Sequence, residues 1–210
     1  AFARLLLCTA LSGLALGAQA RTFEVSDFAE LDDAVIEAED GDEIVIKKGV
    51  YELEAPLEIF SRVSVRGEQG AVIDAGGRGS GFIVRVPKVR IENLTVRNYG
   101  GDLYARDAGV MVGDGADGTE LVNLTLQGPG FGVRADRMNA LVVEGCTIEG
   151  DADRHVLDRG DGIFLSYVKN ARLNHNSLRN VRDGYYLENV DAAKSDFNYF
   201  TGAQYGIHYM

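Results

Sequence analysis

Cysteine, proline and tryptophan are scarce in this 210-residue chain, which has two cysteines, three prolines and no tryptophan. Cys8 falls in an apolar stretch near the start, so the rest of the chain keeps one thiol, Cys146, and cannot form an internal disulfide. The shortage of proline, beside 26 glycines, favours many tight corners and few interrupted strands. The length suffices for one sizeable domain with a continuous apolar core.

Basic residues are also few, because 21 Lys and Arg stand against 32 Asp and Glu and give a formal net charge of −11. No stripe of basic residues occurs, so the sequence predicts no nucleic-acid partner. The lack of tryptophan and of a cleft rich in Lys and Arg disfavours a polysaccharide lyase, which should show a charged groove and rings for sugar stacking.

The longest apolar run, over residues 5–18, has about 14 residues, too few to span a bilayer. Arg4 precedes this run, and Ala18-Gln19-Ala20 follows it with the small-x-small pattern of a cleavage site. Residues 1–20 are therefore expected to be a secretory signal peptide, and the mature chain is expected to begin at Arg21 and to be exported.

A short pattern recurs along the chain. One half of it is an apolar alternating segment such as IENLTV (91–96), with later copies at 121–126, 143–148, 173–178 and 195–200. The other half is a strand opened by a glycine, found at Gly109, Gly132, Gly162, Gly184 and Gly206. Period-2 alternation, roughly 20–30 residues per repeat and glycine at the corners predict a parallel β-helix, which is an all-β solenoid.

The chain before the repeats has a different pattern. Ser26 and Asp27 offer an N-cap, and apolar residues follow at near-helical spacing up to Ala38. We expect this N-terminal helix to cover the open end of the solenoid, whose apolar interior would otherwise face water.

The expected organisation has three parts. A signal peptide spans 1–20, a cap with the first narrow coils spans 21–62, and the β-helix spans 63–210. Because the chain stops at Met210 in the middle of a strand pattern, we expect it to be a fragment that lacks further C-terminal coils.

Alternate coils carry extra residues at one corner. Counted from Asn93, equivalent positions follow after 30, 22, 30 and 22 residues, which places insertions at 98–108 and 150–161. The two insertions lie on the same side of the solenoid and are two coils apart, which is about 10 Å, so they can contact each other. Function is commonly added on such insertions. Their predicted partner-binding carboxylates are Asp107, Asp158 and Asp161. A Ca²⁺ site, an acid/base pair acting on a polysaccharide, and solvated Asp–Arg pairs are the alternatives.

The strand that begins at the repeated glycine presents an unusual outward row: Met111, Arg134, Phe164, Tyr186 and His208. A sheet face in water should be mostly polar, so this row indicates a binding surface, with Met111, Phe164 and Tyr186 as predicted partner contacts. Cross-strand packing of aromatic side chains is the alternative.

His208 and Met210 are two residues apart in a strand pattern and therefore share a face. Imidazole and thioether together suit Cu(I) better than zinc or calcium, so this pair is the predicted metal site and copper the predicted metal. Two ligands do not complete a site, and an outward histidine beside an unrelated methionine is the alternative. The sequence assigns no catalytic residue.

Five blocks occur in a characteristic order: DLYARDAGVMV (102–112), GPGFGV (128–133), DRGDGIFL (158–165), VRDGYYL (181–187) and YGIHYM (205–210). Together they resemble the NosD family of periplasmic nitrous oxide reductase maturation proteins, over roughly 63–210. The resemblance implies a right-handed parallel β-helix in the periplasm, without catalytic activity. It also implies docking on a membrane ABC transporter, a part in assembling the copper centre of nitrous oxide reductase, and a copper chaperone as a further partner.

The resemblance does not supply the copper ligands, so the assignment of His208 and Met210 is a hypothesis from their spacing, and their place in the block YGIHYM adds weight to it. Two other functions remain open at this point. One is a polysaccharide lyase, epimerase or hydrolase on the same fold, since a fold does not define an activity. The other is a structural solenoid with neither activity.

Overall fold

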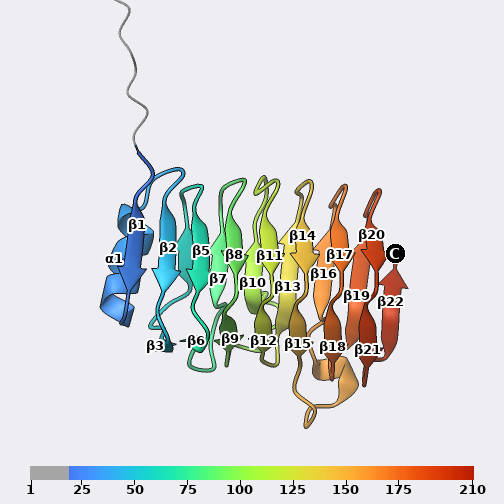
Figure 1. Cartoon of the computed structure of the whole chain (residues 1–210). Helices are drawn as coiled ribbons and strands as arrows, with labels where there is room; N and C mark the ends of the chain where they lie inside the picture. Colours follow the sequence, from blue (N-terminus) through green and yellow to red (C-terminus); the bar gives the residue numbers. More distant parts are fainter. Residues whose placement is uncertain (1–18) are drawn as a thin grey trace, which may run out of the picture.

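Three parallel sheets wrap around one apolar core in the computed structural model, which describes residues 19–210 (Figure 1). After β1, which belongs to the first sheet alone, each coil contributes one strand to each sheet, and the coils stack in sequence order from one end of the molecule to the other. The predicted all-β, right-handed parallel β-helix is confirmed. The signal peptide expected over residues 1–20 lies outside the described residues, apart from Gln19 and Ala20.

The strands are short, and every ladder between them is parallel. The first sheet consists of β1 (Thr22–Val25), β2 (Glu43–Ile46), β5 (Ser64–Gly67), β8 (Arg90–Glu92), β11 (Glu120–Val122), β14 (Val142–Glu144), β17 (Arg172–Asn174) and β20 (Lys194–Asp196). The second consists of β3 (Gly49–Glu52), β6 (Ala71–Asp74), β9 (Thr95–Arg97), β12 (Thr125–Gln127), β15 (Thr147–Glu149), β18 (Ser177–Arg179) and β21 (Tyr199–Thr201). The third consists of β4 (Leu57–Ile59), β7 (Phe82–Val84), β10 (Ala108–Val112), β13 (Phe131–Asp136), β16 (Ile163–Ser166), β19 (Asp183–Glu188) and β22 (Tyr205–Tyr209).

The corner between the first and second sheets requires a left-handed backbone. All five equivalent residues adopt a left-handed backbone: Asn93 (φ 58°), Asn123 (φ 52°), Gly145 (φ 66°), His175 (φ 56°) and Phe197 (φ 57°). Asparagine and glycine adopt this conformation at the lowest cost. The register confirms the predicted alternation of coil length, because Ile91 pairs with Leu121, 30 residues on, and Leu121 pairs with Val143, 22 residues on.

The repeated glycine is required by close packing rather than by its φ angle. A Cβ atom built on Gly162 would lie 2.8 Å from the carbonyl oxygen of Gly184 and would overlap the side chain of Leu178. Only a hydrogen fits between the third sheet and the next coil at this point, and a Cβ atom on Gly109, Gly132 or Gly184 would be at least as close to the carbonyl oxygen of the following coil.

The N-terminal helix α1 (Phe28–Glu37) covers the first coils, at the blue end of Figure 1, as the sequence predicts. Asp27 is its N-cap and accepts a hydrogen bond from the Glu30 amide at 2.9 Å. Leu31 and Ala34 face inward and are buried. No helix in residues 19–210 is long and apolar enough to cross a membrane.

An ion pair closes the cap beside the expected cleavage point. The backbone N–H of Arg21 donates to Asp42 Oδ1 at 2.7 Å, and its guanidinium donates to Asp42 Oδ2 at 2.7 Å. These hydrogen bonds hold the pKa of the Asp42 carboxyl down at about 2. The carboxylate thus ties the beginning of β1 to the turn before β2.

The core is apolar, and Cys146 fills a small position within it. Its side chain is buried, and this burial raises the pKa of the thiol to about 11. A thiol of that pKa is protonated at neutral pH and unreactive. Cys146 is therefore an unreactive packing residue of the core.

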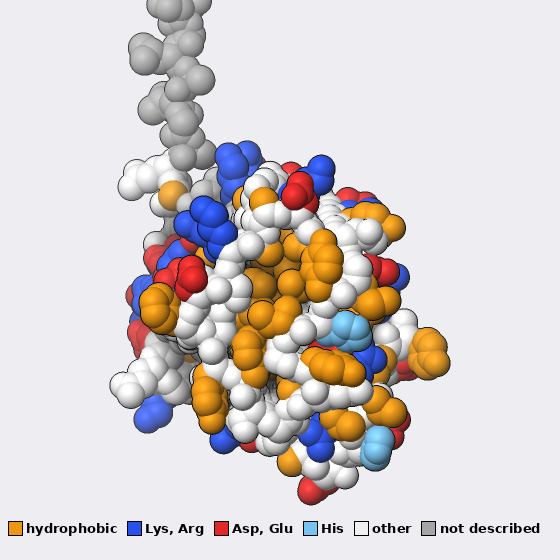
Figure 2. Space-filling view, turned by 90° about the vertical axis from the view of Figure 1, so that its right-hand side faces the viewer, with side chains coloured by type: hydrophobic (Ala, Val, Ile, Leu, Met, Phe, Trp, Pro, Cys, Tyr) orange, Lys and Arg blue, Asp and Glu red, His pale blue; other side chains and the backbone are white. Residues whose placement is uncertain are grey.

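The C-terminal end of the described solenoid exposes apolar side chains, which form the orange area at the centre of Figure 2. Ile207 and Tyr209 occupy inward strand positions, yet 52% and 66% of their surfaces are exposed. Their equivalents one coil earlier, Tyr185 and Leu187, are buried. The difference arises because β22 is the last strand of its sheet in this chain.

Candidate docking site at the two insertions

The two insertions meet over the lean coil between them, as the coil lengths predict. The first joins β9 to β10, and the second joins β15 to β16 and carries a short 3₁₀ helix, η1 (Val156–Asp158). Figure 1 shows the second insertion protruding beyond the ends of its neighbouring strands. Between them lies an open cleft of about 670 Å³, lined by Gly101, Asp102, Leu103, Tyr104, Arg154, Leu157, Asp158 and Arg182.

The sequence interpretation of Asp107 and Asp161 as partner contacts is corrected by their burial. Asp107 is 9% exposed, and its Oδ2 accepts a hydrogen bond from the Asp102 amide at 3.0 Å, which closes the first insertion. Asp161 is fully buried. Both carboxylates hold the insertions together instead of facing a partner, and of the three predicted carboxylates only Asp158 lies at the cleft surface.

Asp161 attaches the second insertion to the next coil. Its Oδ1 accepts a hydrogen bond from Arg182 Nε at 2.9 Å, and its Oδ2 accepts one from Arg182 Nη2 at 2.6 Å. The Asp183 amide also donates to Oδ1 at 3.2 Å. Burial raises the pKa of the Asp161 carboxyl, and the Arg182 guanidinium opposes this increase. Arg182 thus links a buried carboxylate to the wall of the cleft.

Two large side chains that sequence reasoning did not single out project from the insertions. Tyr104 is 100% exposed at the first insertion, and Leu157 is 56% exposed in η1 of the second. Both line the cleft. Their signal in the sequence was the presence of large apolar side chains within segments otherwise rich in Asp, Arg and Gly. Exposed anchors of this kind around a concave surface are typical of protein docking sites.

The outward row of the third sheet has the predicted register. Met111 pairs with Arg134, Arg134 with Phe164, Phe164 with Tyr186 and Tyr186 with His208. The Phe164 and Tyr186 rings stack at 4.9 Å with an interplanar angle of 5°, and the Arg134 guanidinium lies 4.0 Å from the Phe164 ring centroid.

This stacking covers the facing sides of the Phe164 and Tyr186 rings. Cross-strand packing therefore accounts for the choice of these residues. Partner binding by Met111, Phe164 and Tyr186, all of which remain partly exposed, stays a prediction. The first insertion also reaches this row, because Arg106 lies 3.6 Å from Asp136, which in turn holds the nearly buried Arg134.

His208 is oriented by a buried carboxylate from the previous coil. Its Nδ1 lies 2.8 Å from Asp183 Oδ2, and its ring packs against Tyr186 and Tyr205. The imidazole is one-third exposed and Met210 is 63% exposed. In residues 19–210 no group of three or more His, Cys, Asp or Glu side chains is arranged to hold a metal ion. Asp183 thus orients the His208 imidazole, and copper binding by His208 and Met210 stays a prediction.

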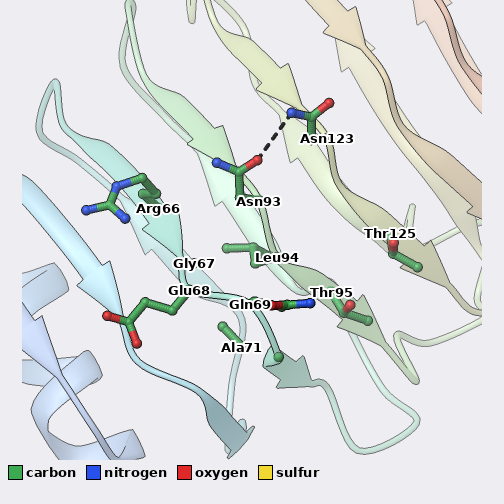
Figure 3. Close-up of a pocket in the computed structure, with 11 residues that line it drawn as sticks. Arg66, Gly67, Glu68, Gln69, Ala71, Asn93, Leu94, Thr95, Asn123 and Thr125 are labelled. Atoms are coloured by element: carbon green, nitrogen blue, oxygen red, sulfur yellow. Dashed lines mark hydrogen bonds between the residues drawn. The ribbon is translucent and has the colours of Figure 1, made fainter.

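A further hollow, of about 560 Å³, lies at the corner between β5 and β6 (Figure 3). Glu68, Gln69 and Gly70 form a three-residue corner there, whereas the next coil turns over Asn93 and Leu94 alone. The side chain of Asn123 donates to Asn93 at 3.2 Å across the neighbouring coils. The change in corner length explains this hollow, and we assign it no chemistry.

Comparison with known proteins agrees with this fold and adds a family. Residues 58–210 match the model of the right-handed β-helix region, and the chain belongs to that family. It is 39% identical over 137 residues to a probable ABC transporter binding protein, NosD, of Stutzerimonas stutzeri, and 36% identical over 136 residues to the NosD protein of Pseudomonas aeruginosa. Each match covers 65% of this chain. The chain is thus similar to these NosD proteins, and the matched part spans 30% of their length.

A putative glycosyl hydrolase from Parabacteroides merdae has the same fold. The TM-score is 0.59 at 13% sequence identity, over 88% of this chain and 96% of that one. At this identity the likeness shows the fold alone and does not transfer an activity.

Proposed function

We propose that this chain is a non-enzymatic, periplasmic accessory protein that binds a membrane ABC transporter and takes part in assembling the copper centre of nitrous oxide reductase. A copper chaperone would be a further partner. The similarity to two proteins named as probable ABC transporter binding proteins supports the first part. The structural observation that carries the proposal is the cleft between the insertions, with Tyr104 and Leu157 exposed at its surface.

A polysaccharide-degrading enzyme is the alternative on this fold, and two observations favour docking over that chemistry. Asp107 and Asp161 are buried and hydrogen-bonded within the chain, so they are not free to serve as an acid/base pair on a substrate. The Phe164 and Tyr186 rings stack on each other, which makes their facing sides unavailable for sugars.

The docking proposal is tested by Tyr104→Ala. Because the side chain is fully exposed at the cleft, its loss should leave folding unchanged and weaken binding to the organism's detergent-solubilised ABC transporter by about tenfold or more. Biolayer interferometry with residues 21–210 measures this affinity. The matched control is Tyr167→Ala, a tyrosine 58% exposed beyond β16, which should bind as the wild type does. Equal weakening by both variants, or no binding by the wild type, would contradict docking through this cleft.

Copper handling is tested separately with the double variant His208→Ala/Met210→Ala. We propose that the two side chains contribute ligands for Cu(I) as cargo, so their loss should lower Cu(I) affinity at least about tenfold. A competition titration with a chromophoric Cu(I) chelator measures this. His175→Ala is the control. That imidazole stacks on Phe197 at a different corner, so its loss should leave the Cu(I) affinity unchanged. Unchanged affinity in the double variant would exclude the strand pair as ligands.

A further inference from the structure

A second concave surface lies between α1 and β4. It is a groove of about 430 Å³ lined by Asp32, Val35, Ile36, Pro56, Leu57, Glu58, Phe60 and Ser61. Two of its apolar side chains are unusually open, because 74% of Ile36 and 65% of Phe60 are exposed. Neither is needed for the core, which α1 reaches through Leu31 and Ala34. The exposed pair therefore requires an explanation outside the packing of the cap.

The groove also borders a free sheet edge. β4 is the terminal strand of the third sheet and is paired only with β7 in the described part of the chain. Leu57 N–H donates to Gly81 O at 3.0 Å, and Ile59 O accepts from Arg85 N–H at 3.0 Å, so both residues direct their backbone groups toward β7. Backbone groups alternate in direction along a parallel strand. Glu58 therefore directs its N–H and C=O toward the unpaired side.

Both walls of the groove carry a carboxylate. On the helix side this is Asp32, and α1 contains three further acidic residues and no basic one. Glu58 adds a carboxylate on the strand side, where Arg85 pairs with it at 3.0 Å and both side chains are well exposed. Such a surface attracts cations and repels a second copy of the same acidic cap, which disfavours a symmetric dimer through this face.

From these observations we propose that the groove receives an extended, basic segment of another protein, which adds to β4 as an eighth strand of the third sheet. Its backbone pairs with the free N–H and C=O of Glu58. One apolar side chain enters the space between Ile36 and Phe60, and flanking Lys or Arg side chains face Asp32 and Glu58. Strand addition combines backbone hydrogen bonds with pockets for alternate side chains, and the groove provides both. This site is independent of the transporter docking proposed above.

A labelled heptapeptide of alternating Lys and Val is the probe, with residues 21–210 as the protein and fluorescence anisotropy as the readout. We expect saturable binding that weakens at high salt. Two variants should weaken it about tenfold or more. Glu58→Pro removes a backbone donor that the fold does not use, and proline is tolerated on edge strands. Ile36→Ser removes the apolar contact at an exposed position.

The matched control is Val50→Ser, which changes a residue 54% exposed on β3, the edge strand of the second sheet, and should leave binding unchanged. Circular dichroism checks that each variant is folded. Slower amide hydrogen exchange at residues 57–60 on peptide addition would place the peptide at this edge. Equal binding of a Lys–Ser peptide, equal weakening by Val50→Ser, or a dimer abolished by Ile36→Ser would each overturn the proposal.

Discussion

Gly162→Ala is expected to lower the free energy of unfolding by about 3 kcal/mol, the upper part of the range for overpacking a well-packed core. The new methyl group would lie 2.8 Å from the carbonyl oxygen of Gly184, a backbone atom that cannot rotate away, and would overlap Leu178. The coil that contains Gly162 and the next coil would have to move apart, which would break the ladder between β16 and β19. Urea denaturation of residues 21–210, followed by circular dichroism, measures the change.

The matched control is Gly206→Ala, the same repeat position in the last strand. There the nearest atom to a new methyl group is Phe200 Cδ2 at 3.4 Å, which is an ordinary contact. The free energy of unfolding of this variant should therefore fall by less than about 1 kcal/mol. If both variants unfold at the urea concentration of the wild type, close packing does not explain the recurring glycine.

Asp161→Ala is the second substitution with a large expected effect, a loss of about 3 kcal/mol. Removing one partner of a buried ion pair leaves the other charge uncompensated, and Arg182 would lose both of its hydrogen bonds to Asp161. The lower end of the usual range applies because the Arg182 side chain is 27% exposed. The Asp183 amide would also lose its acceptor. Thermal and urea unfolding of residues 21–210 give the change in stability.

Asp114→Ala is the control for this second substitution. Asp114 pairs with Arg137 at 3.0 Å, but both side chains are more than 60% exposed, so its loss should cost less than about 1 kcal/mol. A loss in Asp161→Ala as small as that in Asp114→Ala would contradict the structural role assigned to Asp161. In that case Asp161 would again be a candidate for direct contact with a partner.

The contrast between Asp158 and Asp161 shows how far the sequence goes at the candidate site. Both lie in the acidic second insertion, and nothing in their local pattern separates them. In the structure Asp158 lies at the cleft, whereas Asp161 is buried under Arg182. Arg182 is 21 residues away in the chain, and only the register between successive coils brings the two together.

The outward row of the third sheet is a second case in which the sequence predicts the position of side chains but not their contacts. The alternation of the strand correctly placed Phe164 and Tyr186 on the outward face. Whether their faces would meet solvent or each other depends on the stacking of one coil directly above another, which gives 4.9 Å between the rings. The groove at the cap likewise depends on where α1 lies against β4, which no local pattern records.

The sequence by itself determined the parallel β-helix, the alternating coil lengths, the two insertions on one side and the helix at the N-terminal end. Local sequence patterns indicate these features: period-2 alternation, residues at the left-handed corners, and a glycine where two coils are in contact. Tertiary structure alone decided which carboxylates are buried, which side chains line the cleft and the groove, and that Asp183 orients His208. The physical reason is that these contacts join residues from different coils or elements, so they exist only once those elements have packed together in a defined arrangement.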